Sequence, residues 1–303
     1  MAWTQLLEQP RNRIKMQNIA TQSATEHRSD YAHISVRPLS GTLGAEITGA
    51  DLSQPIQDQV FDEIQNAFHE NLVIVLPGQK ISPQNLLTFT EKFGPVEPHP
   101  LGSRRGLDNN PHVMVLENQP GKLGPRNDFW HSDISFDEVP PLGSILYAIE
   151  VTEGKADTIF CNMYEAYERL SAGLKATLDG MSAQHSAENL VREVPNRLSV
   201  DVAPPSVIHP VVRTHPNTGR QALYVNPHYT INFTGWTPEE SQPLLDMLTA
   251  HATRPENTFR HHWKVGDVLM WDNRCAMHYA VRDYDDSMPR LLYRTTAAGD
   301  RPR

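Results

Sequence analysis

From residue 129 onward the sequence consists mainly of short strand-like runs, and this feature most narrows the folds open to the chain. The runs are rich in β-branched and aromatic residues, as strands are, and they occupy residues 144–149, 158–161, 211–213, 223–225, 258–264, 267–271 and 291–296. Helical periodicity interrupts them over residues 164–178 and 238–251. Many short strands with long connections predict a β-rich α+β chain with a closed, double-sheet core of the jelly-roll type and flanking helices.

The first third of the chain has a more mixed α/β character. Residues 56–69 place apolar side chains on one helical face, and residues 72–76 then read as a buried strand. Ser82 and Pro83 begin a second helix, which Gly94 ends. Residues 1–30 are polar and aperiodic, which predicts a flexible N-terminal extension ahead of a single domain at residues 31–303.

Composition excludes several classes of partner. The 303 residues carry 27 Lys and Arg against 36 Asp and Glu, a net charge of -9, so neither nucleic acid nor an anionic membrane is an expected partner. No apolar run is long enough to span a membrane, and the start of the chain lacks a signal-peptide pattern. We therefore expect a soluble, cytoplasmic protein. Cys161 and Cys275 cannot form a disulfide framework and are expected to be buried small hydrophobes.

A candidate metal site begins in residues 127–136, which read as a strand. Residues two apart in a strand project from one face, so His131 and Asp133 can chelate the same ion. His278 offers a third ligand much later in the chain. Two histidines and one carboxylate on one face are typical of non-haem Fe(II) oxygenases. Zinc is an alternative occupant, and surface or capping roles are the alternative for an isolated His-x-Asp pair. Residues 100–127, rich in Gly, Pro and Asn, are expected to form a long active-site loop.

Two arginines follow the last candidate ligand. Arg290 and Arg294 lie four residues apart in a strand, about 13 Å along it, on the same face. The rigid fork of arginine pairs with a carboxylate or sulfonate through two parallel hydrogen bonds. One arginine can therefore hold a cosubstrate carboxylate and the other a substrate anion. Solvated arginines on an edge strand are the alternative.

These residues, in this order, resemble the taurine dioxygenase family of Fe(II)/2-oxoglutarate oxygenases from about residue 36 to residue 303. The phrases that carry the resemblance are residues 44–52 (GAEITGADL), 130–133 (WHSD) and 271–274 (WDNR). The resemblance implies a double-stranded β-helix core. It also implies that His131, Asp133 and His278 are the catalytic iron ligands, and that Thr158 and Arg290 hold the distal carboxylate of 2-oxoglutarate. The family suggests a homo-oligomer.

The same resemblance implies the reaction. O2 and 2-oxoglutarate are consumed, succinate and CO2 form, and a small anionic organic substrate is hydroxylated. Arg294 matches the position that binds the sulfonate of taurine or the carboxylate of an aryloxyalkanoate. His99 and Asn127 match residues that contact taurine, and Tyr229 stands where the taurine enzymes have a phenylalanine lining the pocket.

The leading hypothesis is therefore hydroxylation of taurine or a related alkylsulfonate, with release of sulfite and an aldehyde. The alternative within the family is an aryloxyalkanoate or other carboxylate dioxygenase. Two readings from other classes are a non-catalytic jelly-roll binding protein with a vestigial metal site and a hydrolytic zinc enzyme.

Overall fold

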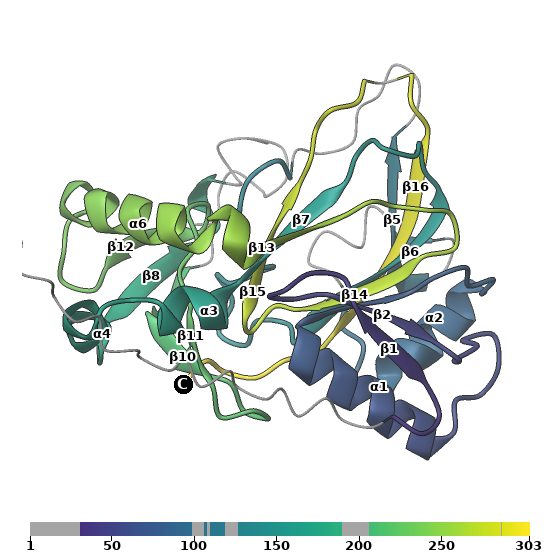
Figure 1. The fold of residues 1–303 in the computed structure, drawn as a ribbon. Helices are drawn as coiled ribbons and strands as arrows, with labels where there is room; N and C mark the ends of the chain where they lie inside the picture. Colours follow the sequence, from purple (N-terminus) through teal and green to yellow (C-terminus); the bar gives the residue numbers. More distant parts are fainter. Residues whose placement is uncertain (1–30, 99–105, 108–109, 119–126, 190–205, 286) are drawn as a thin grey trace, which may run out of the picture. The chain divides into compact units, whose positions relative to one another are not determined.

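An eight-stranded sheet is the largest element of the fold, and both halves of the chain contribute strands to it (Figure 1). The computed structural model describes residues 31–98, 106–107, 110–118, 127–189, 206–285 and 287–303. Residues Tyr31–Arg303 form one compact unit. The expected extension at residues 1–30 lies outside the described residues and stays a prediction.

The large sheet has the strand order β1-β2-β3-β14-β6-β16-β5-β4. Its pairs are antiparallel except for β2 and β3, which run parallel. Its strands are β1 (Ser35–Pro38), β2 (Ala45–Thr48), β3 (Val73–Leu76), β4 (Gly106–Leu107), β5 (Asn110–Asn118), β6 (Gly143–Glu150), β14 (Val268–Asp272) and β16 (Arg290–Ala297).

Alternation along these strands gives the large sheet two apolar faces, because successive side chains point to opposite sides. One face packs against α1 (Asp58–Asn71) and α2 (Pro83–Glu91). The contacts on this side come from Ile74, Leu76, Ile145, Tyr147, Val268 and Met270 of the sheet and Ile64, Phe68, Leu86 and Phe89 of the helices. The other face points into the interior and carries Val73, Val75, Leu146, Ala148, Leu269, Trp271 and Leu292.

A second sheet closes this interior. It has the order β13-β7-β15 and consists of β7 (Thr158–Asn162), β13 (Thr258–His261) and β15 (Ala276–Ala280). Phe160, Phe259 and Met277 pack from it against the inward face of the large sheet. The two facing sheets confirm the predicted β-rich fold with a jelly-roll core and flanking helices. Cys161 and Cys275 are buried and free, as expected.

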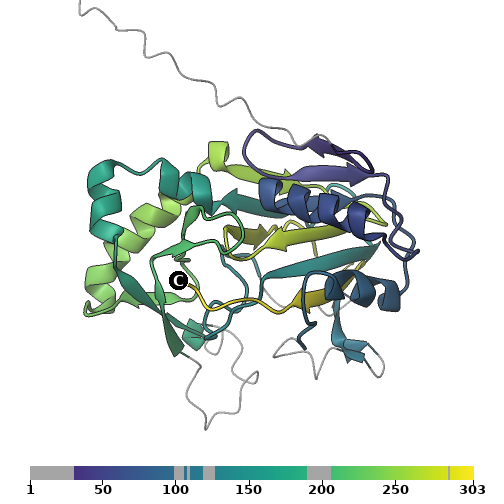
Figure 2. The same ribbon diagram turned by 90° about the horizontal axis from the view of Figure 1, so that it is seen from below.

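Two smaller sheets lie at the other end of the molecule, to the left in Figure 1. One has the order β12-β8-β9 and the other pairs β10 with β11. Their strands are β8 (Ser182–Ser186), β9 (Ser206–Pro210), β10 (Val212–Thr214), β11 (Gln221–Leu223) and β12 (Thr230–Phe233). The C-terminus lies beside β10 (Figure 2), where the Thr214 amide donates a hydrogen bond to the Arg303 carbonyl.

Local sequence signals explain how the helices begin. Ser82 caps α2 with a capping box completed by Asn85, and Thr237 with Glu240 does the same for α6 (Pro238–Ala252). The single helix expected over residues 164–178 is wrong. Two helices stand there, α3 (Met163–Glu168) and α4 (Ala172–Leu178), because the Ser171 side chain accepts a hydrogen bond from the Leu174 amide and starts a new helix. A short 3-10 turn, η2 (Pro255–Asn257), follows α6.

Two further expectations about the region before β6 are wrong. Residues 100–127 are not one long loop, because β5 occupies nine of them and pairs with β16. Residues 127–136 are not a strand either. His131 makes a single bridge to His278, and Ile134 has a φ of 51°, which turns the chain away from an extended path.

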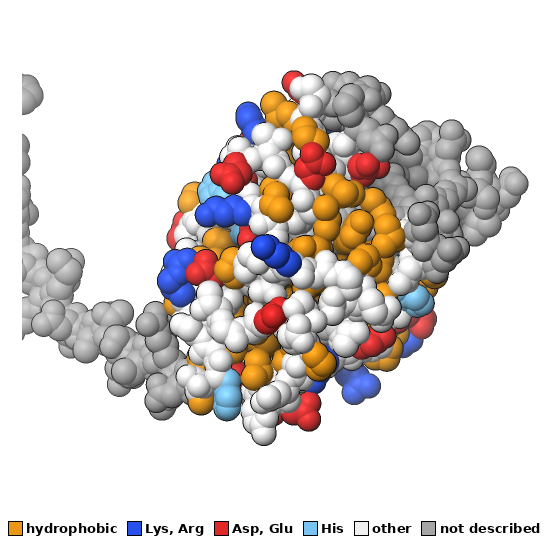
Figure 3. Space-filling view, turned by 90° about the vertical axis from the view of Figure 1, so that its right-hand side faces the viewer, with side chains coloured by type: hydrophobic (Ala, Val, Ile, Leu, Met, Phe, Trp, Pro, Cys, Tyr) orange, Lys and Arg blue, Asp and Glu red, His pale blue; other side chains and the backbone are white. Residues whose placement is uncertain are grey.

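No helix in the described ranges is both long and apolar enough to cross a membrane. Figure 3 shows the face that lies to the right in Figure 1. Apolar side chains gather there beside the grey residues, and positive and negative side chains are interspersed over the rest of that face. The charge on this face is therefore mixed and not of one sign.

Candidate metal centre

The backbones of His131 and His278 are paired although the two residues are 147 positions apart in the sequence. The His131 amide donates to the His278 carbonyl at 3.1 Å, and the His278 amide donates to the His131 carbonyl at 2.8 Å. His278 lies in β15 of the smaller core sheet. The bridge sets the two imidazole rings side by side, with centroids 4.1 Å apart.

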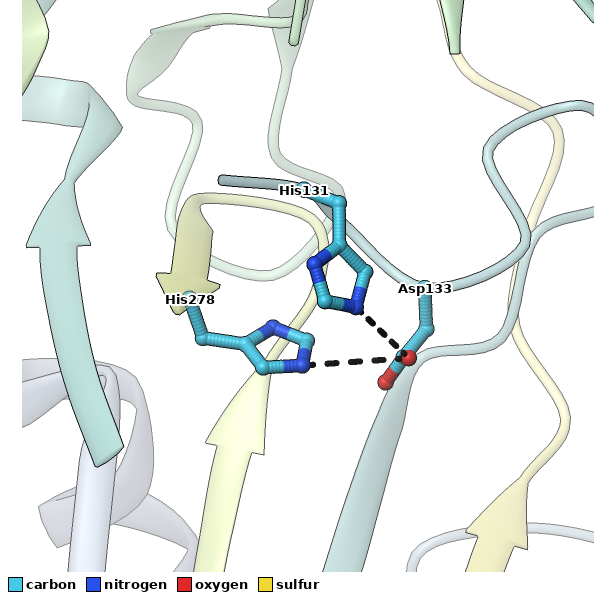
Figure 4. A group of neighbouring side chains, drawn as sticks. All are labelled: His131, Asp133 and His278. Atoms are coloured by element: carbon cyan, nitrogen blue, oxygen red, sulfur yellow. Dashed lines mark ion pairs between the residues drawn. The ribbon is translucent and has the colours of Figure 1, made fainter. Parts of the chain in front are cut away.

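Asp133 completes a group of three buried side chains (Figure 4). Its Oδ1 lies 3.8 Å from Nε2 of His131 and 3.9 Å from Nε2 of His278. These distances are too long for hydrogen bonds. They leave room for one ion bound to all three atoms, since bonds from such ions to nitrogen and oxygen ligands are about 2 Å long. The donor set of two imidazoles and one carboxylate fits Fe(II).

Both histidines are prepared to act as neutral ligands. Nδ1 of His131 donates to the Phe129 carbonyl at 2.9 Å, which leaves the lone pair on Nε2 free. Burial lowers the pKa of His131, partly opposed by Asp133, and burial with the neighbouring His131 lowers the pKa of His278 well below its ordinary value. A neutral imidazole is the form that binds metals.

The second oxygen of Asp133 has different neighbours. Ser144 donates to Oδ2 at 2.9 Å, and Nη2 of Arg294 lies 2.9 Å from the same oxygen. Burial alone would raise the pKa of this carboxyl, but the charge of Arg294, the electrostatic interaction with the two imidazole rings and the Ser144 hydrogen bond hold it well below the usual range. Asp133 is therefore ionised, with Oδ1 left for the ion.

The turn after Asp133 fixes the direction of its side chain. Ile134 adopts a left-handed conformation that is rare for a β-branched residue. The Asp133 amide donates to Oδ1 of Asn273 at 3.3 Å, and that oxygen also accepts the indole N–H of Trp271 at 2.8 Å. Residues from the WDNR phrase thus support the backbone of a candidate ligand.

Arg290 and Arg294 both point to the interior side of β16, the side that carries Leu292. Arg290 borders a small pocket together with Asn118, Thr152, Ala156 and Tyr284. Its Nε is buried and has no partner among the described residues, and burial lowers its pKa. An unpaired buried guanidinium nitrogen is costly, so this position fits an anion.

Thr158 stands at the start of β7, and its hydroxyl accepts the indole N–H of Trp263 at 3.0 Å. The hydroxyl proton is therefore still available for donation. Thr158 and Arg290 contact different groups in the structure. Ala156, two residues before Thr158, borders the Arg290 pocket.

Of the three further residues expected to contact the substrate, the structure describes two. Tyr229 is buried, with its ring 6.0 Å from that of His131. Asn127 is half-buried, and its carbonyl accepts the Ala280 amide at 3.1 Å, beside β15. His99 lies outside the described residues, and its role stays a prediction.

Two supporting groups escaped the sequence analysis, namely the Ser144 hydroxyl and the Phe129 carbonyl. The His228 ring, which the sequence places at the rim of the site without a ligand role, stacks on Phe129 with centroids 3.5 Å apart. Burial lowers the pKa of His228 to about 4, and its Nε2 has no partner within the described part of the chain. A carbonyl has no signature in sequence. A lone serine in an otherwise apolar inward run of β6 was the one available signal.

A second buried group, His215, Asp272 and Cys275, also has metal-like spacing. Arg274 occupies both oxygens of Asp272, with bonds of 2.8 and 2.7 Å, and His215 donates to one of them at 3.0 Å. Burial and Asp272 raise the pKa of Cys275 well above its ordinary value, so the thiolate that a metal needs is disfavoured. This group is a satisfied ion-pair network.

Comparisons with known proteins agree with the geometry. A family model described as "Taurine catabolism dioxygenase TauD, TfdA family" matches residues 35–296. An alpha-ketoglutarate-dependent sulfate ester dioxygenase from Pseudomonas putida is 34% identical over 89% of this chain and 91% of its own length. A 2,4-dichlorophenoxyacetate dioxygenase from Cupriavidus pinatubonensis is 33% identical over 87% of this chain and 97% of its own.

A solved structure gives the same result. A taurine dioxygenase from Burkholderia xenovorans superposes with a TM-score of 0.76 at 35% identity, covering 89% of this chain and 91% of that one. The family uses Fe(II), 2-oxoglutarate and O2, and the His-Asp-His group supplies a donor set of the matching kind. The chain therefore belongs to the TauD/TfdA family and is an oxidoreductase, a 2-oxoglutarate-dependent dioxygenase.

Proposed function

We propose that the chain hydroxylates the carbon next to a sulfur oxyanion in a small organic substrate, with taurine or a related alkylsulfonate as the leading candidate. The observation that carries this proposal is Arg294, a buried arginine beside the candidate metal ligand Asp133. Its Nε has no partner among the residues described. A buried guanidinium with an unpaired Nε can donate hydrogen bonds to a substrate anion at a short distance from the metal.

The metal assignment is part of the proposal. Nε2 of His131, Nε2 of His278 and Oδ1 of Asp133 would hold Fe(II), which supplies the activation of O2 for C–H hydroxylation. The geometry supports this because all three atoms lie within 4.8 Å of one another and are buried. The two histidines and Asp133 have the protonation states that ligands require, as their pKa shifts indicate.

Arg290 and Thr158 are proposed to bind the distal carboxylate of 2-oxoglutarate. The unpaired Nε of Arg290 and the free hydroxyl proton of Thr158 supply donors of the kind a carboxylate needs. Arg290 lies four residues from Arg294 on the same strand face. The cosubstrate and the substrate would therefore be held by separate arginines, one at each end of the site.

The relatives support a sulfur oxyanion as the substrate group. One relative is named for sulfate esters and one structural neighbour for taurine. Hydroxylation of the carbon that bears a sulfonate gives an unstable product that separates into an aldehyde and sulfite. Hydroxylation of the carbon that bears a sulfate ester likewise gives an unstable product, which separates into an aldehyde and sulfate.

An aryloxyalkanoate substrate is the second candidate, and a specific observation favours it. Aromatic rings gather near His131: Tyr229 lies 5.0 Å from Phe136 and 4.7 Å from His228, and His228 stacks on Phe129. These rings could pack against an aryl group. One relative is named for 2,4-dichlorophenoxyacetate.

The experiment begins with anaerobic titration of the apo-protein with Fe(II) and 2-oxoglutarate, followed by visible absorption. O2-dependent succinate formation is then measured with taurine, other alkylsulfonates, alkyl sulfates and aryloxyacetates. Sulfite, sulfate and phenol are assayed separately. Sulfite or sulfate coupled to succinate supports the proposal, whereas phenol alone moves the substrate to the second candidate.

Asp133→Ala provides the control for the metal assignment. We expect this variant to lose the Fe(II)-dependent absorption band and succinate formation together, because it removes one of three ligands. An Asp133→Ala enzyme with full turnover would contradict the assignment. His262→Ala is the matched variant, since its ring is exposed and pairs with Asp157 instead.

A further inference from the structure

We propose that Ser144 is a positioning residue, whose hydroxyl acts with Arg294 to hold Oδ2 of Asp133 so that Asp133 offers the metal one oxygen. The inference rests on the proposed function in one respect, namely that Asp133 is a metal ligand. It adds a residue outside the ligand set and assigns Arg294 a second role beside anion binding.

Three short contacts form a closed triangle. Ser144 Oγ lies 2.9 Å from Oδ2 of Asp133, Nη2 of Arg294 lies 2.8 Å from Ser144 Oγ, and the same Nη2 lies 2.9 Å from Oδ2. The direction of each bond follows from the chemistry of the groups. Arginine has only donors and an ionised carboxylate has only acceptors, so the serine must accept from Arg294 and donate to Asp133.

The sheet fixes the serine hydroxyl in place. Ser144 lies in β6 between two neighbours, paired with Trp271 of β14 on one side and Thr296 of β16 on the other. Its side chain is fully buried. The preceding Gly143 has no room for a side chain, since an added Cβ would come within 2.5 Å of the Trp271 carbonyl. A hydroxyl on so tightly packed a strand has little freedom to move away.

The triangle divides the two oxygens of Asp133 between two tasks. Oδ2 is occupied by Ser144 and Arg294, while Oδ1 faces Nε2 of both histidines. Without the Ser144 hydroxyl, Oδ2 would keep Arg294 as its one strong partner, and Nη2 of Arg294 would lose an acceptor. Both the carboxylate and the guanidinium would then be less well oriented. The effect should reach the metal and the substrate anion.

The test compares metal binding by wild type, Ser144→Ala and Ser144→Thr under anaerobic conditions, with Co(II) as the probe. We expect the Kd for Co(II) to rise about tenfold or more in Ser144→Ala, as removal of hydrogen-bond partners of metal ligands generally does. The ligand-field spectrum of bound Co(II) should change as well. Ser144→Thr keeps the hydroxyl and should restore most of the affinity.

Thr295→Val is the matched control. Thr295 follows Arg294 in β16, and its buried hydroxyl lies on the opposite face of the strand, where it forms a hydrogen bond with the Thr90 hydroxyl. The substitution therefore removes a buried hydroxyl that is not part of the triangle. Its Co(II) affinity should equal that of wild type. Thermal unfolding of each apo-protein shows whether a variant is folded, and a loss of metal affinity in a folded Ser144→Ala protein supports the proposal.

Kinetics provides the second readout. The KM for the substrate should rise more in Ser144→Ala than the KM for 2-oxoglutarate, because Arg290 contacts none of the triangle. Equal Co(II) affinity and spectrum in wild type and Ser144→Ala would overturn the role of Ser144 and leave the metal assignment intact. Failure of wild type to bind Co(II) in an Asp133-dependent way would instead overturn the proposed function.

Discussion

Arg290 and Arg294 share a strand face but have different neighbours. Nη2 of Arg294 contacts Asp133 and Ser144, whereas Arg290 borders the small pocket with Asn118 and Tyr284. Nε of each arginine has no partner in the described part of the structure. We therefore predict that Arg290→Ala raises the KM for 2-oxoglutarate about ten- to hundredfold, as for loss of a hydrogen bond between charged groups. Steady-state kinetics with each substrate varied in turn measures the effect.

Arg294→Ala should have a different signature. The KM for the substrate should rise more than the KM for 2-oxoglutarate, and Co(II) affinity should also fall, because Arg294 touches Oδ2 of Asp133. Replacement of either arginine by lysine keeps the charge without the two-pronged fork, so recovery should be partial. Identical effects of both alanine variants on both substrates would contradict this division of roles.

Helices α2, α3, α4 and α6 each begin at a residue whose side chain accepts a hydrogen bond from an amide of the first turn. The α6 capping box joins the Glu240 amide to Thr237 Oγ1 at 3.2 Å and the Thr237 amide to Glu240 Oε2 at 2.9 Å. We predict that Thr237→Ala lowers the free energy of unfolding by about 1 kcal/mol, because an amide of the first turn loses its acceptor. Urea unfolding measures the difference.

Thr237→Ser is the matched variant and should retain most of the stability, since a serine hydroxyl can accept the same bond. Co(II) affinity should stay unchanged in both variants. A stability of Thr237→Ala equal to that of wild type would mean that packing of Leu245 and Leu248, which are buried on this helix, determines where α6 begins.

Buried histidines make the stability of the molecule sensitive to acid. Burial, with the neighbouring His209, lowers the pKa of His185 to about 3. The unfolded chain has a histidine pKa of about 6.5. Between these values the unfolded state binds the extra proton, so this contribution to stability is complete above about pH 6.5 and falls as the pH decreases toward 3.

We predict that wild type loses about 2 kcal/mol more stability than His185→Gln between about pH 7.5 and about pH 5, from the slope of about 1.4 kcal/mol per pH unit below 6.5. Urea unfolding of the apo-proteins at both pH values is the measurement. His185 contacts Ser135, Tyr224 and His209, so the variant is less stable at every pH. Parallel loss of stability in both proteins would remove the assignment to His185.

The homo-oligomeric state and cytoplasmic location stay predictions.

Much of the architecture could be read from the amino-acid sequence, because the signals involved are local. The runs rich in β-branched and aromatic residues predict the strands β6, β14 and β16, and the serine and threonine caps predict the starts of α2 and α6. The grouping of His131, Asp133 and His278 could also be anticipated. Metal coordination allows few residue types, and the His-x-Asp spacing of His131 and Asp133 marks two of the three positions.

Other features depend on partners far away in the sequence. The Pro and Asn residues of β5 locally favour a loop, while its pairing with β16 supplies the hydrogen bonds that hold it as a strand. His131 and Asp133 converge through one bridge and a turn at Ile134, not through a strand. Ser144 joins the site because the register of β6 with β14 and β16 points it at Asp133. Neighbours along the chain specify strands and caps, whereas the register between distant strands specifies which side chains meet.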